Sequence, residues 1–296
     1  MKFKIAAALA LVLASSAPAQ SPKLKLWRLD CGDFIMKKYG AWFSDTFQYP
    51  AGAKTLVGSC YLIANGDRYL LWDTGLADEL TQRPVDNEEQ RMSLKRSLLQ
   101  QLGQIGVRPE QIEIVGISHF HADHTGQARH FPNAKLVIGR ADWDALENSA
   151  HPGLKDAKEH LAHWLTGPGK AVQAAGDVDI FHDGRVVMLA MPGHTPGHSA
   201  LLVRLASGPV LLSGDQYHFT EAVRNRGVPS FNTDRADTLA SHDRFDRIAD
   251  NLKAKVVIPL PGGYLPCQHR KPQHQAASVI LTTKRHSLFS TTSRGS

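Results

Sequence analysis

Runs of apolar residues along the chain, some alternating with polar residues, predict a series of short strands. The clearest pair is a β-hairpin that turns at Asn65, Gly66 and Asp67, because short turns of this composition join antiparallel strands. The predicted strands are residues 23–29, 59–64, 68–72, 112–117, 186–190, 199–205, 210–212 and 255–258.

Four stretches between these strands repeat apolar residues at helical spacing. They are residues 88–105, 141–148, 154–165 and 238–252, and Gly106 is placed to end the first of them. Residues 221–234 are polar and are interpreted as a loop near the mouth of a site. Strands that alternate with helices indicate the α/β class. Nothing in the 296 residues resembles a linker between domains.

The first 19 residues have the pattern of a secretory signal peptide. Lys2 and Lys4 precede a short apolar run over 5–14, and residues 17–19 supply small side chains for cleavage before Gln20. The run is far shorter than the ~20 apolar residues that span a bilayer, so a membrane anchor is the weaker interpretation. We therefore expect a mature protein that is periplasmic or secreted and makes no membrane contact after cleavage.

The net charge of +6 is concentrated at the carboxyl end. Residues 251–296 hold seven basic residues and no acid, and without these and the two signal-peptide lysines residues 20–250 have a net charge of −3. Aromatic residues are not interleaved with the basic ones, so we expect no nucleic-acid partner. Residues 20–262 are expected to form one domain, and residues 263–296 an atypical basic tail, for which disorder is one interpretation.

The chain has three cysteines, Cys31, Cys60 and Cys267. In an exported protein Cys31 and Cys60 could form a disulfide, which would leave Cys267 unpaired. A chain of this length does not need a crosslink to fold, so we favour the interpretation that both are small buried apolar residues. No cysteine lies in a metal-ligand pattern, which argues against a thiolate zinc site.

The densest group of metal-binding side chains is a His-x-His-x-Asp-His motif. His119, His121, Asp123 and His124 lie within six positions, directly after the predicted strand 112–117. Imidazole nitrogen and carboxylate oxygen are typical zinc ligands. In an extended turn His119 and His121 point the same way and can bind one ion, while Asp123 and His124 can bind a second.

Two later turns supply further candidate ligands. His194 lies in a turn rich in glycine and proline after one predicted strand, and Asp215 follows Gly214 after another. A lone histidine is seldom a ligand. The His119 motif and the turns that carry His194 and Asp215 each follow an apolar strand, and together they predict a metal site.

In this order the motifs resemble those of the metallo-β-lactamase superfamily, over residues 56–258. Asp73, Thr74 and Gly75 are similar to an early Asp-x-Gly turn of that superfamily, in which the aspartate supports the metal ligands. The resemblance implies an α/β fold of the αβ/βα four-layer sandwich type. It also implies a first zinc ion on His119, His121 and His194, a second zinc ion on Asp123 and His124, and a bridging carboxylate from Asp215.

Within the superfamily the chain is similar to the N-acyl homoserine lactonase-like group, through residues 29–32, 61–63 and 215–219. This similarity implies a small-molecule substrate, a lactone opened by a hydroxide that bridges two zinc ions, with Asp123 protonating the departing oxygen. In such lactonases a tyrosine soon after the bridging aspartate polarises the substrate carbonyl. Tyr217 stands nearest to that place here, and His218 is the alternative.

Two other functions remain open on the sequence. A β-lactamase or a glyoxalase II-like thioesterase is the alternative enzyme, although the Gly-Asp turn at Asp215 argues against a β-lactamase. A protein that binds metal without catalysing a reaction is the alternative from another class. The oligomeric state does not follow from the sequence.

The last metal ligand of the family is missing from its expected place. A histidine should follow the strand 255–258, but residues 259–268 contain none, and His269 is the first. A shifted reading frame or natural divergence would each explain this. We therefore predict that the second zinc ion is held only by the ligands already named and by water. It should bind more weakly than the first ion unless His269 replaces the missing ligand.

Overall fold

The computed structural model describes residues 23–259, and its strands form two sheets. The strands of the first sheet are β1 (Leu24–Met36), β2 (Lys54–Asn65), β3 (Arg68–Trp72), β4 (Val85–Asp86), β5 (Gln90–Ser93), β6 (Ile112–Gly116), β7 (Lys135–Gly139) and β8 (Ala171–Ala174). Their order across the sheet is β4-β5-β1-β2-β3-β6-β7-β8.

The second sheet is built from the later part of the chain. Its strands are β9 (Val178–Asp179), β10 (Val186–Ala190), β11 (Ser199–Leu205), β12 (Gly208–Leu212) and β13 (Lys255–Val257), in the order β13-β12-β11-β10-β9. The α-helices are α1 (Tyr39–Trp42), α2 (Leu98–Ile105), α3 (Ala122–Thr125), α4 (Arg140–Asn148), α5 (Lys155–His160), α6 (Ala162–Leu165), α7 (Thr220–Asn225) and α8 (Arg235–Leu252).

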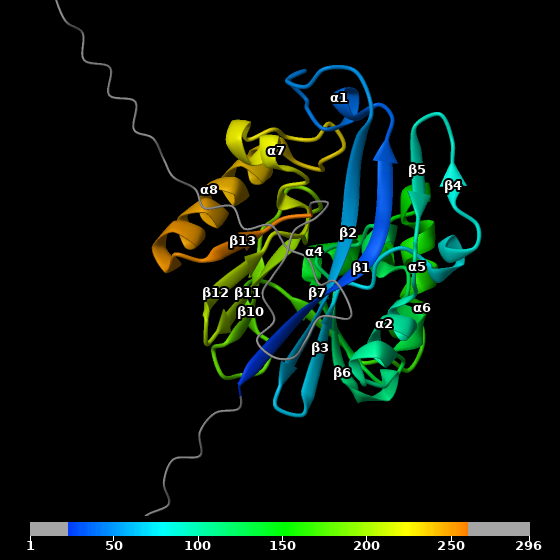
Figure 1. The fold of residues 1–296 in the computed structure, drawn as a ribbon, viewed down its shortest axis with the longest axis vertical. Helices are drawn as coiled ribbons and strands as arrows, with labels where there is room; N and C mark the ends of the chain where they lie inside the picture. The colour runs from blue at the N-terminus through cyan, green and yellow to red at the C-terminus, as the bar shows by residue number, and fades with distance from the viewer. Residues whose placement is uncertain (1–22, 260–296) are drawn as a thin grey trace, which may run out of the picture.

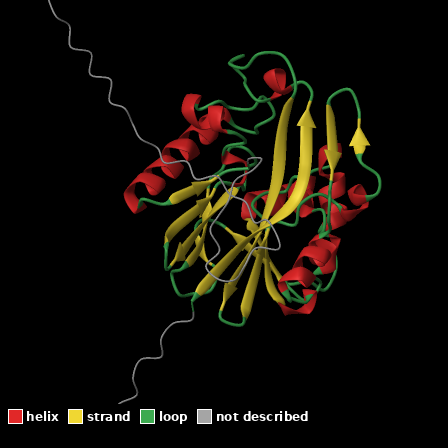
Figure 2. Cartoon of the chain, viewed as in Figure 1, coloured by secondary structure: helices red, strands yellow, loops and turns green. Residues whose placement is uncertain are grey.

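The two sheets pack face to face, and helices cover their outer sides (Figure 1; Figure 2). Ile63 and Trp72 of the first sheet and Met188 and Leu201 of the second belong to one buried cluster between the sheets. Leu102 of α2 packs in a second cluster outside the first sheet, and α8 contributes to a third outside the second sheet. This is the four-layer αβ/βα sandwich that the resemblance implied.

Most predicted elements are present, but the helix 88–105 and the loop 221–234 are each wrong in part. The hairpin of β2 and β3 turns after Asn65 as predicted, and Gly106 ends α2 in the left-handed conformation at φ 82°. The helix predicted over 88–105 starts only at Leu98, because Gln90–Ser93 forms β5 and pairs with β1. Pairing with β1 supplies hydrogen-bond partners for the backbone of β5, and the helical spacing of apolar residues in this segment could not reveal that pairing. The polar stretch 221–234 also contains α7 rather than loop alone.

The direction of the strands brings four turns to one edge of the sandwich. β3 and β6 are parallel, so both end at the same edge of the first sheet. β10 and β12 are both antiparallel to β11 and therefore run in the same direction as each other. The turns that follow β3, β6, β10 and β12 carry Asp73, the His119 motif, His194 and Asp215, respectively.

Cys31 and Cys60 form a disulfide with a Cα–Cα distance of 5.7 Å. The interpretation that both are unbonded buried residues is therefore wrong, although both are buried. Cys31 lies at an irregularity between β1 and β2, where the register shifts between Asp30 and Gly32. Leu29 pairs with Cys60, so Cys31, two residues further along β1, lies on the same face of the sheet as Cys60.

Several predictions concern residues outside 23–259. They are the signal peptide at 1–19, the tail at 263–296, Cys267 and His269. Among the residues that the structure describes, no helix combines the length and the apolar character needed to cross a bilayer.

Candidate metal centre

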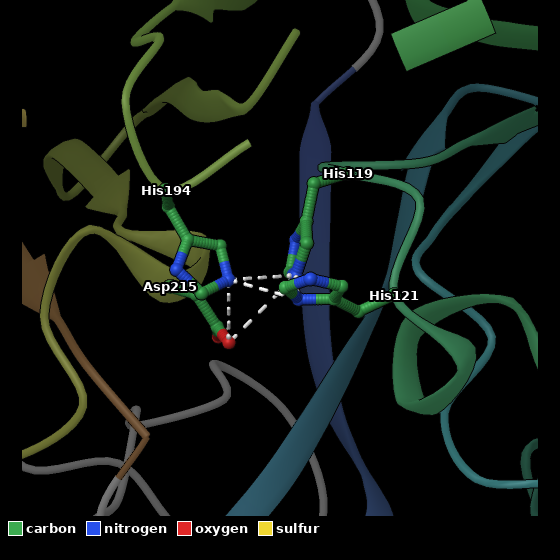
Figure 3. Close-up of side chains that lie close together, drawn as sticks. All are labelled: His119, His121, His194 and Asp215. Carbon is green, nitrogen blue, oxygen red and sulfur yellow. Dashed lines mark hydrogen bonds and ion pairs between the residues drawn. The ribbon is translucent and has the colours of Figure 1, made fainter. Parts of the chain in front are cut away.

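The candidate ligands converge from three turns at the edge of the sandwich. Figure 3 shows His119 and His121 on one side and His194 and Asp215 on the other, with their side chains pointing toward one another. His119 and His121 lie in the extended segment between β6 and α3, and the other two come from the turns after β10 and β12.

Three imidazole nitrogens of the first cluster almost touch. His119 Nε2 lies 2.9 Å from His121 Nδ1 and 3.1 Å from His194 Nε2, and His194 Nε2 lies 3.0 Å from His121 Nδ1. Asp215 Oδ2 lies 3.5 Å from His194 Nε2 and 3.8 Å from His119 Nε2. Ligands placed tetrahedrally at the usual zinc–nitrogen distance are about 3.3 Å apart. The four atoms therefore have the spacing of one zinc coordination sphere.

The protonation of the cluster also suits a metal ion. Burial lowers the pKa of both His119 and His194 well below the usual value, and neighbouring imidazoles lower it further. Both side chains are thus neutral near pH 7, and His194, whose Nδ1 donates to Asn232 Oδ1, presents the lone pair of its Nε2 to the cluster. Metal ligands must be deprotonated, so the site needs no proton removed from these two residues.

The second cluster is made by Asp123, His124 and Asp215. His124 Nε2 lies 3.3 Å from Asp215 Oδ1 and 3.7 Å from Asp123 Oδ2. Asp215 thus points one oxygen at each cluster, the geometry expected of a bridging ligand. Burial lowers the pKa of His124, but the carboxylates of Asp215 and Asp73 outweigh burial and hold that pKa well above the usual value.

Asp73 supports this arrangement from the turn after β3. Its Oδ1 accepts the Ser118 N–H at 2.7 Å, and its Oδ2 lies 2.9 Å from His124 Nδ1. Its φ of 60° is rare outside glycine and indicates a functional constraint on the turn. The predicted supporting role of Asp73 therefore fits its contacts with His124 and with the start of the His119 motif.

Other side chains orient the remaining ligands. Asn232 Oδ1 lies 2.9 Å from His194 Nδ1, and Ser118 Oγ lies 3.0 Å from His119 Nδ1. His198 accepts the Asp215 N–H at 3.0 Å on Nε2, and burial lowers its pKa to about 4. Such partners fix the tautomer and ring orientation of metal-binding histidines. Sequence reasoning missed Asn232, because a lone asparagine in a polar stretch carries no distinguishing pattern.

The expectation that Tyr217 contacts the substrate does not fit the structure. Its side chain is buried, stacks on His242 at a centroid distance of 4.4 Å, and directs its hydroxyl to Asp246 Oδ1 at 3.2 Å. His218, the alternative, lines the cavity instead, and its Nε2 lies 3.2 Å from Asp215 Oδ2. Tyr217 is in extended conformation, so neighbouring side chains leave the backbone on opposite sides, and only one can face the ligands.

A cavity of about 720 Å³ opens onto the ligands. Its polar wall includes Asp123, His124, Asp215 and His218, and the remaining wall is mainly apolar. The apolar side chains include Phe34, Met36, Trp42, Phe43, Leu56 and Phe231. Phe231 is 42% exposed and packs edge-on against His194, which places part of the polar stretch 221–234 at the mouth, as predicted.

The chain matches the family model of the metallo-beta-lactamase superfamily over residues 53–269. It is 32% identical over 163 residues to the N-acyl homoserine lactonase AttM of Azorhizobium caulinodans, and the match covers 53% of this chain and 61% of the relative. The matched region therefore spans less than two thirds of that relative's length.

Two solved structures share the fold. A quorum-quenching N-acyl homoserine lactone hydrolase superposes with a TM-score of 0.68 at 20% identity, covering 80% of this chain and 92% of the other. AidC, a dizinc quorum-quenching lactonase in complex with a product, superposes with a TM-score of 0.63 at 18% identity, covering 90% and 97%. At these identities the likeness is one of fold.

Proposed function

Because the chain belongs to the metallo-β-lactamase superfamily, we propose that it is a zinc-dependent hydrolase that opens a lactone bearing an apolar acyl chain, such as an N-acyl homoserine lactone. The observation that carries the proposal is the meeting of the two His/Asp clusters with one largely apolar cavity. The N-acyl homoserine lactonase activity of the AttM relative supports the lactone.

The cavity explains how such a substrate would be held. A lactone ring beside Asp215 and Asp123 leaves its acyl chain against the apolar wall around Phe34, Trp42 and Leu56. Burial of each methylene there is worth about 0.8 kcal/mol. The cavity volume lies in the usual range of small-molecule sites.

The residues of the site divide the chemistry of ring opening between them. Bound zinc would lower the pKa of a water molecule and polarise the lactone carbonyl. His119, His121 and His194 would hold the first ion and Asp123, His124 and Asp215 the second. As the ester C–O bond breaks, the departing ring oxygen needs a proton, which Asp123 on the cavity wall can take from the attacking water and pass on. His218, beside Asp215 on the cavity wall, would polarise the substrate carbonyl in place of Tyr217.

We further propose that the second ion binds more weakly than the first. Among residues 23–259, four side chains surround the first position, whereas three surround the second, and Asp215 is shared. Zinc titration of the metal-free protein tests this, with His269→Ala as the second arm. Two sites of equal affinity, both unaffected by His269→Ala, would refute the weak site.

Export to the periplasm or beyond remains part of the proposal. The Cys31–Cys60 disulfide supports it, because disulfides persist in oxidising compartments. Mass spectrometry of the protein recovered from a periplasmic fraction would test it: a chain beginning at Gln20 supports export, and an intact chain in the cytoplasm refutes it.

A substrate panel on the zinc-loaded mature protein tests the activity. We expect N-acyl homoserine lactones to gain the mass of one water and to be hydrolysed faster than nitrocefin or a thioester. Faster turnover of nitrocefin or the thioester would replace the lactonase proposal with the corresponding alternative. No turnover of any of the three at full zinc occupancy would favour a protein that binds metal without catalysis.

A further inference from the structure

One buried carboxylate outside the two ligand clusters has no part in the function proposed above. Asp142 lies in the first turn of α4 and is 0% exposed. Its carboxylate accepts three hydrogen bonds: from the Phe120 N–H at 3.0 Å, from Thr195 Oγ1 at 2.8 Å and from the Gly197 N–H at 2.6 Å.

These donors come from the two turns that carry the first zinc ligands. Phe120 lies between His119 and His121, and Thr195 directly follows His194. Asp142 Oδ2 accepts from both Phe120 and Thr195, so a single oxygen atom joins the turn after β6 to the turn after β10. The two turns belong to different sheets, and their separation sets the distance between His194 and the other two histidines.

The backbone around Asp142 is built for this contact. A Cβ on Gly139, at the end of β7, would overlap the carbonyl oxygen of Gly197, and a Cβ on Gly197 would lie 2.5 Å from the Asp142 backbone nitrogen. Only glycine at these two positions lets the turn after β10 approach the start of α4 closely enough for the Gly197 N–H to reach Asp142.

Keeping an acid at this place is costly. Burial raises the pKa of Asp142 to about 7, and the hydrogen bonds from Thr195, Gly197 and Phe120 oppose the rise. An apolar residue could fill the same space without that cost, but it could not accept hydrogen bonds from both turns.

We propose that Asp142 is a positioning residue, which holds the turn of His119 and His121 and the turn of His194 at zinc-binding separation. The inference rests on the proposed metal centre and adds a residue that sets its geometry without touching the ion. Loss of such outer hydrogen bonds typically lowers metal affinity by about 10- to 100-fold.

Zinc affinity and the absorption spectrum of bound Co²⁺ test this role. Asp142→Asn keeps the shape of the side chain but turns an NH₂ group toward one of the three donors. Thr195→Val removes a single donor with little change in shape, and Thr195→Ser restores the hydroxyl. Asp144→Asn is the matched control, because Asp144 lies on the same helix and is exposed.

We expect Asp142→Asn to weaken zinc at the tighter site by about 10- to 100-fold and to shift the Co²⁺ spectrum. Thr195→Val should cause a smaller loss that Thr195→Ser reverses, and Asp144→Asn should match the wild type. A purely structural role would lower the thermal midpoint but leave the Co²⁺ spectrum unchanged. If circular dichroism shows that Asp142→Asn does not fold, the comparison of Thr195→Val with Thr195→Ser tests the positioning role instead.

Two outcomes separate this inference from the proposed function. Wild-type affinity and an unchanged Co²⁺ spectrum in folded Asp142→Asn, or in Thr195→Val where Asp142→Asn does not fold, would overturn the positioning role alone. Failure of the wild-type protein to bind either ion would overturn the metal centre and the positioning role with it.

Discussion

Reduction of the Cys31–Cys60 disulfide should destabilise the protein by several kcal/mol. The bond joins β1 to β2 across a sequence separation of 29 residues. In the chain-entropy description of crosslinks, a closed loop of that length contributes about 3.6 kcal/mol to the free energy of unfolding. Total stabilities of about 5–15 kcal/mol make this a large share.

The disulfide also lies against the turn that supports the second ligand cluster. A Cβ on Gly75 would approach the Cys31 sulfur to 2.7 Å, and the Leu76 N–H donates to the Cys31 carbonyl at 3.0 Å. Gly75 is two residues from Asp73, whose carboxylate contacts His124. Loss of the bond at Cys31 should therefore lower the affinity for the second zinc ion more than the affinity for the first.

Urea unfolding of the metal-free protein, with and without a phosphine reductant, measures the effect. The denaturant midpoint should fall and the slope should rise, because the reduced unfolded chain is less compact and exposes more surface. A Cys31→Ala/Cys60→Ala double variant is the control and should not respond to reductant. Thiol labelling under denaturing conditions should modify one cysteine before reduction and all three after it. Three reactive thiols before reduction, or an unchanged midpoint after it, would refute the reasoning.

Three further outcomes follow from the site. Tyr217→Phe should keep turnover within about twofold, because the Tyr217 hydroxyl contacts Asp246 rather than the cavity. His218→Ala should lower turnover by about 10²-fold. If steady-state kinetics show the reverse order, Tyr217 has the catalytic role and His218 does not. Asp123→Asn should lower turnover by about 10²-fold or more with zinc still bound, since the amide cannot protonate the leaving oxygen, and near-normal turnover would make Asp123 a spectator. The raised pKa of His124 means that zinc must displace a proton there, so affinity at the second site should rise with pH, up to about tenfold per unit below that pKa. Zinc affinity at the first site should not depend on pH near pH 7. Calorimetry in buffers of different ionisation enthalpy measures the protons released on binding, and a proton released at the first site rather than the second would contradict the prediction.

The sequence by itself determined the metal-binding chemistry and most of the strands. His119, His121, Asp123 and His124 are neighbours along the chain, so their type and spacing already define two groups of ligands. The hairpin of β2 and β3 could be predicted for the same reason, because a short turn between apolar strands is a local property.

The tertiary structure decided everything that depends on contacts between distant segments. The segment Gln90–Ser93 became a strand because β1 offered it backbone partners. Cys31 and Cys60 became a disulfide because the pairing of β1 with β2 brought two segments of the chain side by side. His218 rather than Tyr217 faces the ligands because a turn sets which of two neighbours points inward. Asp142 gained its role only when the two sheets brought the turns of His119 and His194 to one carboxylate. Local spacing fixes which side chains are available, but their separation in space depends on packing between elements, and no pattern within a single segment encodes that separation.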